Sequence, residues 1–469
     1  MIFQHRFDPS TLREYDIRGV VGTTLGPEDA YAIGRTFGSM VARAGGWRIV
    51  IGHDGRLSSP ALERALVEGA VASGMVVQRI GCGPTPMLYF ASIALGADGA
   101  VMVTGSHNPP DHNGFKMVCA NRPFFGARIR ELGRLSAAGD VVPHYPGTTH
   151  DVDIRSDYVA RLLRDRDDGP RPLKVIWDNA SSAAGEVLSL LTSRLPGTHR
   201  ILNAAIDGRF PAHHPDPTIP ANMRQLADAV RQDGADIGMA FDGDADRIGV
   251  VDDTGTILWA DQLLVLLARD VLREHPGATI IADVKASQTL FDEIARAGGT
   301  PLMWKSGHSP MKTKMAETQA PLAGEMSGHI FLADRWYGFD DALYAAIRLL
   351  GIVSRLDMPL SAVRKALPAT FSTPELRFDC PESRKFDVIA EVASRLEKSG
   401  ATVCAIDGVR VSTVDGWWLL RASNTQALLV ARAEAASRSA LERLKAELCA
   451  QLALSGIAAP DFTGTDAEH

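Results

Sequence analysis

The chain has 469 residues, of which 45% are hydrophobic and 22% are charged, and its formal net charge is -7. A chain of this length predicts about three or four domains with apolar cores of ordinary size. The negative net charge and the lack of a long Lys/Arg run argue against a nucleic-acid surface, because neutralising phosphates requires clustered basic residues.

The sequence also carries no clear pattern for a membrane span, a signal peptide or a disulfide framework. No apolar stretch approaches the roughly 20 residues needed to span a bilayer, and the first residues lack the apolar segment of a signal peptide. The five cysteines are scattered without CxxC spacing, which argues against a disulfide framework and a zinc site. We therefore expect a cytoplasmic protein that binds neither membranes nor nucleic acid.

The first elements are a loop and a helix. Residues 14–19, Glu-Tyr-Asp-Ile-Arg-Gly, combine charged and aromatic residues before a glycine and predict a loop. Arg18 in this loop is either a solvated charge or an anion ligand. Residues 27–44 predict a helix.

A pattern of strand, aspartate, polar turn and helix then occurs three times, over residues 48–72, 174–191 and 279–297. Each copy is followed by a short strand signal and by a further strand that ends in an unusual loop. This alternation predicts βαβ units with parallel or mixed sheets. We expect three similar α/β domains, each contributing one loop from the carboxyl end of a strand. The expected boundaries are 1–150, 151–254 and 255–367.

The repeated pattern stops near residue 367. Helix signals at 386–396 and 437–454, with strand signals at 401–406 and 417–420, predict a smaller α+β domain. We place this C-terminal domain at residues 368–469.

The loop of the first domain carries a serine. Residues 99–103 form a short apolar run that predicts a buried strand, and the loop Thr-Gly-Ser-His-Asn-Pro-Pro follows it at 104–110. Ser106 therefore lies where an open α/β sheet places reactive groups, with Lys116 close in sequence. The alternative is that Ser106 only caps a turn.

The loop of the second domain is acidic. Asp242, Asp244 and Asp246 follow the apolar run 237–241. Three carboxylates that converge on one point repel each other unless a cation is bound, and an oxygen-preferring ion such as Mg²⁺ suits them. A calcium EF-hand requires Gly at the sixth and Glu at the twelfth position, whereas this loop has Arg and Asp there. A solvated acidic turn is the less favoured alternative.

Two further loops carry polar groups suited to a sugar phosphate. Glu325, Ser327 and His329 alternate along a glycine-flanked loop and suit a polyhydroxylated ligand. The segment 421–425, Arg-Ala-Ser-Asn-Thr, is equally consistent with a phosphate cradle and with a capped turn. The two histidines in the Pro-rich stretch 210–217 are interpreted as part of a structured linker and not as a metal pair.

The four loops together favour phosphoryl transfer on a sugar phosphate. They offer a hydroxyl nucleophile, a Mg²⁺ site, a sugar-binding loop and a phosphate cradle. The sequence contains neither a GxxxxGK[ST] P-loop nor a strand–GxGxxG–helix fingerprint. Nucleotide-dependent kinase and dehydrogenase activities are therefore disfavoured.

These loops resemble the signature loops of the α-D-phosphohexomutase family, in the same order and at the family's spacing. Residues 14–19, 113–116, 213–217 and 307–309 also match. The resemblance covers essentially the whole chain and is strongest to the bacterial phosphomannomutase/phosphoglucomutase branch, whose sugar loop reads Gly-Glu-Met-Ser-Gly-His as it does here.

The resemblance implies three similar mixed α/β domains and a C-terminal α+β domain around a central cleft. It also implies an isomerase that reversibly interconverts hexose 1-phosphate and hexose 6-phosphate, with mannose and glucose as substrates. Ser106 would be phosphorylated, and the reaction would pass through a 1,6-bisphosphate. The implied cofactors are one Mg²⁺ per chain, held by Ser106 and the three aspartates at 242, 244 and 246, and glucose 1,6-bisphosphate as activator. We expect a monomer.

The resemblance further implies roles for individual residues. The expected catalytic residues are Ser106, Lys116, Arg18, His308 and His329. The expected substrate contacts are Tyr15, Arg247, Lys285, His308, Glu325, Met326, Ser327, Gly328, His329, Arg421, Ala422, Ser423, Asn424 and Thr425. If Glu325 and Ser327 hold only the O3 and O4 hydroxyls, C2 is barely read, and both glucose and mannose should react.

Alternative functions remain open, and the sequence differs from the family pattern at a few positions. A phosphoglucosamine mutase usually has a Ser-Gly-Thr-Glu type phosphate loop, and the Ser-Asn-Thr at 423–425 argues against it. A sugar-phosphate phosphatase would transfer the phosphoryl group to water, and a non-catalytic sugar-phosphate binder would not need Ser106. Departures from the family pattern are His112, Pro310 and the Gln-Ala pair at 426–427, none of which removes a functional group.

Overall fold

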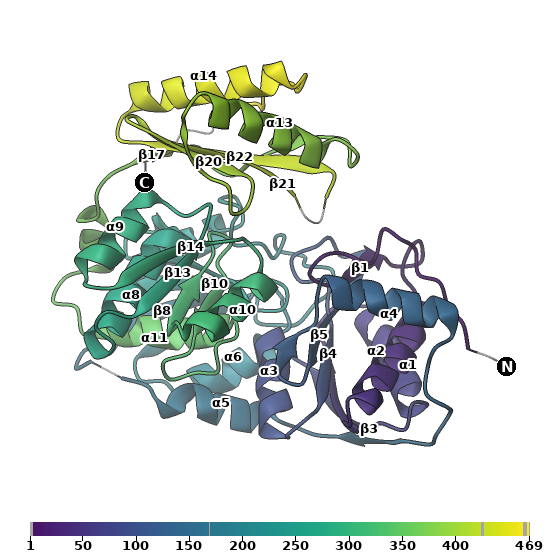
Figure 1. Cartoon of the computed structure of the whole chain (residues 1–469). Coiled ribbons are helices and arrows are strands. Elements are labelled where there is room, and N and C mark those ends of the chain that lie inside the picture. The colour runs from purple at the N-terminus through teal and green to yellow at the C-terminus, as the bar shows by residue number, and fades with distance from the viewer. Residues whose placement is uncertain (1–2, 168, 424–425, 463–466, 469) are drawn as a thin grey trace.

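The computed structural model describes residues 3–167, 169–423, 426–462 and 467–468. Asn424 and Thr425, expected in the phosphate loop, therefore lie outside the described residues. Within these ranges, no helix is both long and apolar enough to cross a membrane. Figure 1 shows the first domain and the C-terminal domain as separate lobes beside a central body formed by the second and third domains.

The first domain is built on a mixed sheet with the strand order β1-β5-β4-β2-β3-β7. Its strands are β1 (Ile17–Val20), β2 (Arg48–His53), β3 (Val76–Cys82), β4 (Gly99–Val103), β5 (His112–Cys119), β6 (Arg122–Pro123) and β7 (Thr148–Asp151). Its helices are α1 (Pro27–Arg43), α2 (Ser59–Val71), α3 (Thr85–Ala94) and α4 (Ala127–Ala138). Strands β2, β3, β4 and β7 run parallel, whereas β5 is antiparallel to β1 and β4.

The second and third domains repeat this plan with smaller sheets, ordered β12-β11-β10-β8-β9 and β14-β13-β15-β16. The second contains α5 (Arg155–Arg164), β8 (Lys174–Asp178), α6 (Gly185–Thr192), β9 (Thr198–Leu202), α7 (Arg224–Asp233), β10 (Ile237–Phe241), β11 (Ile248–Asp252) and β12 (Ile257–Leu258). The third contains α8 (Ala260–Glu274), β13 (Thr279–Asp283), α9 (Gln288–Arg296), β14 (Thr300–Trp304), α10 (His308–Thr318), β15 (Leu322–Gly324), β16 (Ile330–Leu332), α11 (Ala342–Ser354) and α12 (Leu360–Lys365). Because β12 pairs with β11, the second sheet extends past the boundary expected at residue 254.

The C-terminal domain is an antiparallel sheet with two helices on its outer face (Figure 1). Its elements are β17 (Phe371–Ser372), β18 (Leu376–Asp379), α13 (Lys385–Lys398), β19 (Thr402–Cys404), β20 (Val409–Thr413), β21 (Gly416–Ala422), β22 (Leu428–Ala435), α14 (Arg438–Leu454) and β23 (Ala467–Glu468).

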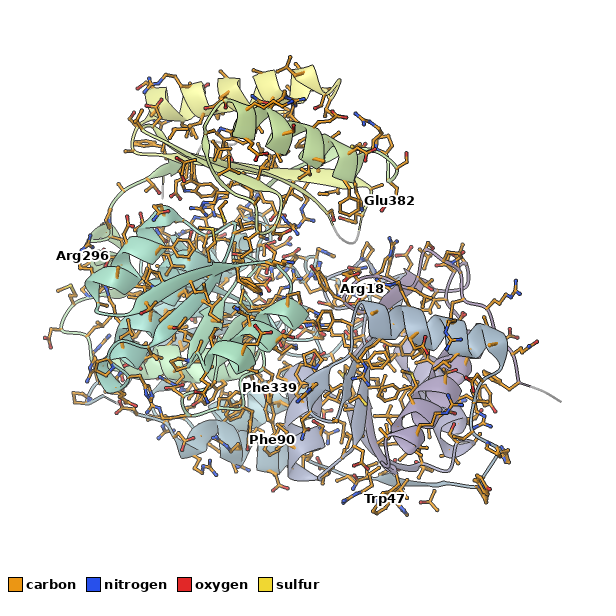
Figure 2. The ribbon with its side chains drawn as sticks, in the orientation of Figure 1. Arg18, Trp47, Phe90, Arg296, Phe339 and Glu382 are labelled. Atoms are coloured by element: carbon orange, nitrogen blue, oxygen red, sulfur yellow. The ribbon has the colours of Figure 1, made fainter. Side chains whose placement is uncertain are left out.

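One hydrophobic core joins the first three domains. In β4, Ala100 and Met102 belong to the core around α3, whereas Val101 and Val103 face the separate core under α1 and α2. The α3 core continues into the second and third domains. Figure 2 shows Phe90 of α3 near Phe339 of the third domain at this junction. Burying one continuous apolar surface fixes the three domains relative to one another.

The C-terminal domain has its own core and a narrower attachment. Arg410 is 1% exposed and donates to the carbonyl oxygens of Val284 and Ala286 at 2.7 and 2.8 Å. Its guanidinium lies 3.7 Å from the ring centroid of Trp417. These contacts place the C-terminal sheet beside the carboxyl end of β13.

The expected loop at residues 14–19 is partly a strand. Ile17 to Val20 form β1, and Arg18 pairs with Gly114 of β5 in antiparallel register. The sequence prediction was wrong here because the pairing partner lies about a hundred residues away, and the local composition carries no strand pattern. Arg18 is consequently fixed on a strand and not on a loop.

The histidine pair at 213–214 behaves as a linker element. His213 Nε2 lies 2.8 Å from Asp178 Oδ2, at the end of β8. Burial lowers the pKa of His213, but the hydrogen bond and charge of Asp178 outweigh burial and raise it above its ordinary value. The contact therefore ties the 210–217 stretch to the second sheet.

This ion pair predicts a pH-dependent contribution to stability. Because the folded-state pKa of His213 is raised, its contribution is fully present below the unfolded value of about 6.5 and is lost as pH rises through the folded value. We expect His213→Gln to lower the free energy of unfolding more at a pH of about 5.5 than at about 9, measured by urea unfolding. Exposed His144→Gln is the control, and an equal loss at both pH values would contradict the prediction.

Candidate active site

Ser106 lies on a strained loop that buried charges hold in place. Its φ is +50°, a left-handed conformation that costs a non-glycine residue about 1 kcal/mol or more. Asp54 Oδ2 accepts from the Thr104 hydroxyl at 2.8 Å and from the Gly105 N–H at 3.1 Å. Arg56, which is 1% exposed, donates to the Ser106 carbonyl oxygen at 2.7 Å. Asp54 and Arg56 therefore hold the backbone of the loop that carries Ser106.

The serine loop and the acidic loop meet directly. Ser106 Oγ donates to Asp242 Oδ2 at 2.9 Å. A Cβ on Gly243 would lie 2.2 Å from the Ser106 carbonyl oxygen, so only glycine permits this approach. The hydroxyl of the first domain is thereby placed at the edge of the carboxylate cluster of the second.

Asp242, Asp244 and Asp246 form one cluster at the end of β10. All three are 0% exposed, and one oxygen of each lies within 4.8 Å of the others. Burial and the charges of the two neighbouring carboxylates raise the pKa of Asp242 well above its usual range. Lys116 Nζ lies 2.7 Å from Asp244 Oδ2 and 2.5 Å from Asp246 Oδ2.

This cluster fits a hard divalent cation. Burial lowers the pKa of Lys116, but the charges of Asp244 and Asp246 hold it well above its usual value, so its ammonium stays charged. Lys116 brings one positive charge to three carboxylates, and the raised pKa of Asp242 reflects their mutual repulsion. Asp244 Oδ1 and Asp246 Oδ1 are buried without a hydrogen-bond partner among the described residues. Such all-oxygen donor sets suit Mg²⁺.

The sugar-type loop reaches the acidic loop through His329. Arg247 Nε donates to His329 Nε2 at 3.0 Å, and the two residues also form an isolated antiparallel bridge. The His308 ring stacks on His329 at a centroid distance of 5.9 Å. Burial and the nearby positive charge of Lys312 lower the pKa of His308 well below its usual value, so its imidazole is neutral at pH 7.

Glu325 organises the neighbouring part of the third domain. It is 6% exposed and accepts from the Gly307 N–H at 3.0 Å and from the Ser327 hydroxyl at 3.1 Å. Burial raises its pKa. Gly307 has a φ of +123°, and a Cβ there would lie 2.6 Å from the Tyr15 ring, which brings Tyr15 against this loop.

The remaining residues of the sugar-type loop are held by backbone contacts. The Met326 N–H donates to Asp283 Oδ1 at 3.1 Å. The Gly328 N–H donates to the Glu325 carbonyl oxygen at 2.9 Å, and its φ is +91°. These bonds shape the turn between β15 and β16.

Two expected substrate cations are paired with acids of the C-terminal domain. Arg421 Nε donates to Asp407 Oδ2 at 3.0 Å, and the same oxygen accepts from the Ser306 N–H at 3.1 Å. Lys285 Nζ lies 2.8 Å from Glu375 Oε2. Both acids were missed from the sequence because a single acidic residue outside a motif carries no local signal.

The phosphate-type loop starts where β21 ends, at Ala422. Lys385 is 2% exposed and donates to the carbonyl oxygens of Ser423 at 2.7 Å and Gln426 at 3.0 Å. A buried ammonium therefore anchors both flanks of this loop.

The expected site residues differ in how directly they contact one another. Direct contacts link Ser106 and Lys116 to the three aspartates, and link the acidic loop to His329 and His308. Arg18 lies on the serine-loop side, where it donates to Asn108 Oδ1 at 2.9 Å. Arg421 is linked to the third domain through Asp407, whose Oδ2 also accepts from the Ser306 N–H.

Comparisons with known proteins agree along most of the chain. Models of the four phosphoglucomutase/phosphomannomutase domains match, namely alpha/beta/alpha domain I at residues 10–132, domain II at 156–255, domain III at 259–371 and the C-terminal domain at 375–451.

Individual relatives match over nearly the full length of this chain. A phosphomannomutase/phosphoglucomutase of Pseudomonas aeruginosa is 44% identical over 93% of this chain and 94% of its own. A phosphoglucomutase of Neisseria meningitidis is 44% identical over 92% and 94%. A crystal structure of a phosphoglucomutase/phosphomannomutase family protein from Burkholderia thailandensis is 42% identical, with a TM-score of 0.91 over 97% of this chain and 99% of that one.

Four matched domain models in the right order, together with relatives that span almost their full length, leave one assignment. The chain belongs to the phosphoglucomutase/phosphomannomutase family and is an enzyme that interconverts hexose phosphates.

Proposed function

We propose that this chain interconverts the 1- and 6-phosphates of both glucose and mannose, with Ser106 as the residue that carries the phosphoryl group. The observation that supports this most is the 2.9 Å contact between Ser106 Oγ and Asp242 Oδ2 at the edge of three buried carboxylates. A hydroxyl held by a strained loop beside concentrated negative charge suits a phosphoryl carrier whose charge a cation offsets.

The reaction has two transfers. In the first, the bond between phosphorus and Ser106 Oγ breaks, a bond forms to the free hydroxyl of the hexose phosphate, and that hydroxyl loses its proton to the enzyme. The resulting 1,6-bisphosphate turns over in the site. In the second transfer its other phosphoryl group returns to Ser106 Oγ, and the freed sugar oxygen regains a proton. Lys116, His308, His329 and Arg18 are the groups available for proton transfer and charge stabilisation.

Mg²⁺ is the proposed cofactor, one per chain, held by Asp242, Asp244, Asp246 and the phosphorylated Ser106. When bound, it supplies positive charge that offsets the charge on the phosphoryl oxygens during transfer. Catalytic amounts of glucose 1,6-bisphosphate would prime Ser106. All five cysteines are free thiols, in keeping with the proposed cytoplasmic location, and the chain is proposed to work as a monomer.

The substrate is proposed to bind in two orientations. Arg421, Ser423 and their neighbours Asn424 and Thr425 would hold the phosphate that is not reacting. Glu325 and Ser327 would bind the O3 and O4 hydroxyls, with further contacts from Tyr15, Arg247, Lys285, Met326, Gly328 and His329. If O3 and O4 carry the sugar recognition, the configuration at C2 matters little.

The first test measures turnover on both sugars. Phosphorus NMR with Mg²⁺ and a trace of glucose 1,6-bisphosphate should show 6-phosphate forming from glucose 1-phosphate and from mannose 1-phosphate. Ser106→Ala should lower kcat by on the order of 10⁴-fold or more, whereas the exposed Ser439→Ala should not change it.

Two outcomes would contradict the proposal. Conversion of glucose 1-phosphate alone would show that C2 is read and that the O3/O4 argument is wrong. Accumulation of inorganic phosphate would show a phosphatase on this scaffold.

The second test separates the metal site from other acidic clusters. Among the described residues, two further groups have possible ligands, namely Asp246–His329–Asp340 and Glu274–His275–Asp334. Mg²⁺ prefers oxygen donors, so calorimetric titration should show Asp244→Asn weakening Mg²⁺ binding by at least about 10-fold and Glu274→Gln leaving it unchanged. The reverse pattern would place the ion elsewhere.

A further inference from the structure

Thr85 is a buried residue of the first domain that lies outside the four signature loops. It is the first residue of α3, directly after Pro84, and it is 0% exposed. Figure 1 shows α3 on the side of the first domain that faces the central body. A buried hydroxyl needs a hydrogen-bond partner, and the hydroxyl of Thr85 has its partner in the second domain.

Two hydrogen bonds join Thr85 to Asp244 of the acidic loop. The Thr85 N–H donates to the Asp244 carbonyl oxygen at 2.9 Å, and the Thr85 hydroxyl donates to Asp244 Oδ2 at 2.5 Å. The N–H at the first position of a helix has no partner within the helix, so the acidic loop satisfies the start of α3. The backbone and the side chain of Asp244 are thereby both held from the first domain.

The two carboxylate oxygens of Asp244 have different surroundings. Oδ2 accepts from the Thr85 hydroxyl and from Lys116 Nζ, the latter at 2.7 Å. Oδ1 is buried and has no hydrogen-bond partner among the described residues. A buried carboxylate oxygen without a partner is costly, and a bound cation would remove that cost. Oδ1 is therefore the oxygen of Asp244 that is left for Mg²⁺.

Lys116 does not orient Asp244 by itself. Its ammonium is shared with Asp246 Oδ2 at 2.5 Å, and an ammonium on a flexible four-carbon side chain acts as a point charge without a fixed direction. The Thr85 hydroxyl belongs to a β-branched side chain with few χ1 rotamers, at the start of a helix. Thr85 is therefore the donor that fixes the orientation of the Asp244 carboxylate.

We propose that Thr85 is a positioning residue of the metal site, whose hydroxyl holds Asp244 Oδ2 and leaves Oδ1 for the cation. This inference rests on the proposed function, because Mg²⁺ is proposed there as the bound ion. Hydrogen-bond partners of metal ligands typically change metal affinity by about 10–100-fold. Through Thr85, the first domain tunes the metal affinity of carboxylates that belong to the second.

The experiment compares Mg²⁺ binding to full-length variants by calorimetric titration without any sugar phosphate. Thr85→Val removes the hydroxyl at nearly unchanged volume and should weaken Mg²⁺ binding by about 10–100-fold. Thr85→Ser keeps the hydroxyl and should restore most of that affinity. Thr36→Val is the matched control and should not change Mg²⁺ binding. Thr36 is another buried threonine of the first domain, and its hydroxyl has no hydrogen-bond partner among the described residues.

A crystal structure of the wild-type protein with Mg²⁺ tests the same point without a variant. It should show the ion on one oxygen of Asp244 and the Thr85 hydroxyl on the other. An ion bound by the oxygen that Thr85 holds would overturn the inference, even if Thr85→Val fails to fold. Wild-type affinity in Thr85→Val would overturn it as well, and so would a Thr85→Ser variant that binds as weakly as Thr85→Val.

Failure of the proposed function gives a different pattern. If the variants bind Mg²⁺ as expected and no sugar phosphate reacts, the proposed mutase activity fails and the role of Thr85 stands. If the wild-type protein converts sugar phosphates and binds Mg²⁺, but Thr85→Val changes nothing, only the inference fails. A wild-type protein that binds no Mg²⁺ would overturn both.

Discussion

The molecule depends on placing three buried carboxylates of one domain beside a hydroxyl and an ammonium of another. Asp242, Asp244 and Asp246 repel each other in a fully buried site, and Lys116 from β5 compensates only part of their charge. The cluster is stable only where the first two domains meet, because Ser106, Lys116 and Thr85 all contact it from the first. The contact between these two domains is therefore part of the site and not merely a scaffold for it.

The way in which the hydrophobic core is divided among the domains suits this need for a close contact between the first two domains. The first three domains share one continuous core, so their loops meet with little freedom. The C-terminal domain has a separate core and a narrow attachment around Trp417 and Val284. The proposed phosphate loop thus lies on the least constrained module, and its Arg421 reaches the third domain through Asp407. This arrangement suits a site that must accept a substrate in two orientations.

The sequence predicted the residues of the candidate site better than the buried residues that hold those site residues in place. Ser106 and the three aspartates stand out because each follows a buried strand directly, and the α/β domains follow from the repeated strand–helix alternation. Arg56, Asp340 and Asp407 were missed because a single polar residue outside a motif carries no local signal in the sequence. Arg18 was placed on a loop because β1 exists only through its pairing with β5. The domain boundaries and the individual site roles stay predictions.

The most direct test of the account is to follow one phosphoryl group through Ser106. The protein would be incubated with radiolabelled glucose 1,6-bisphosphate and Mg²⁺, freed of sugar, mapped by peptide mass spectrometry, and then given unlabelled mannose 1-phosphate. The account predicts one labelled phosphoryl group on the peptide containing Ser106 and its transfer to the sugar. Label on another residue, or label that leaves only as inorganic phosphate, would contradict it.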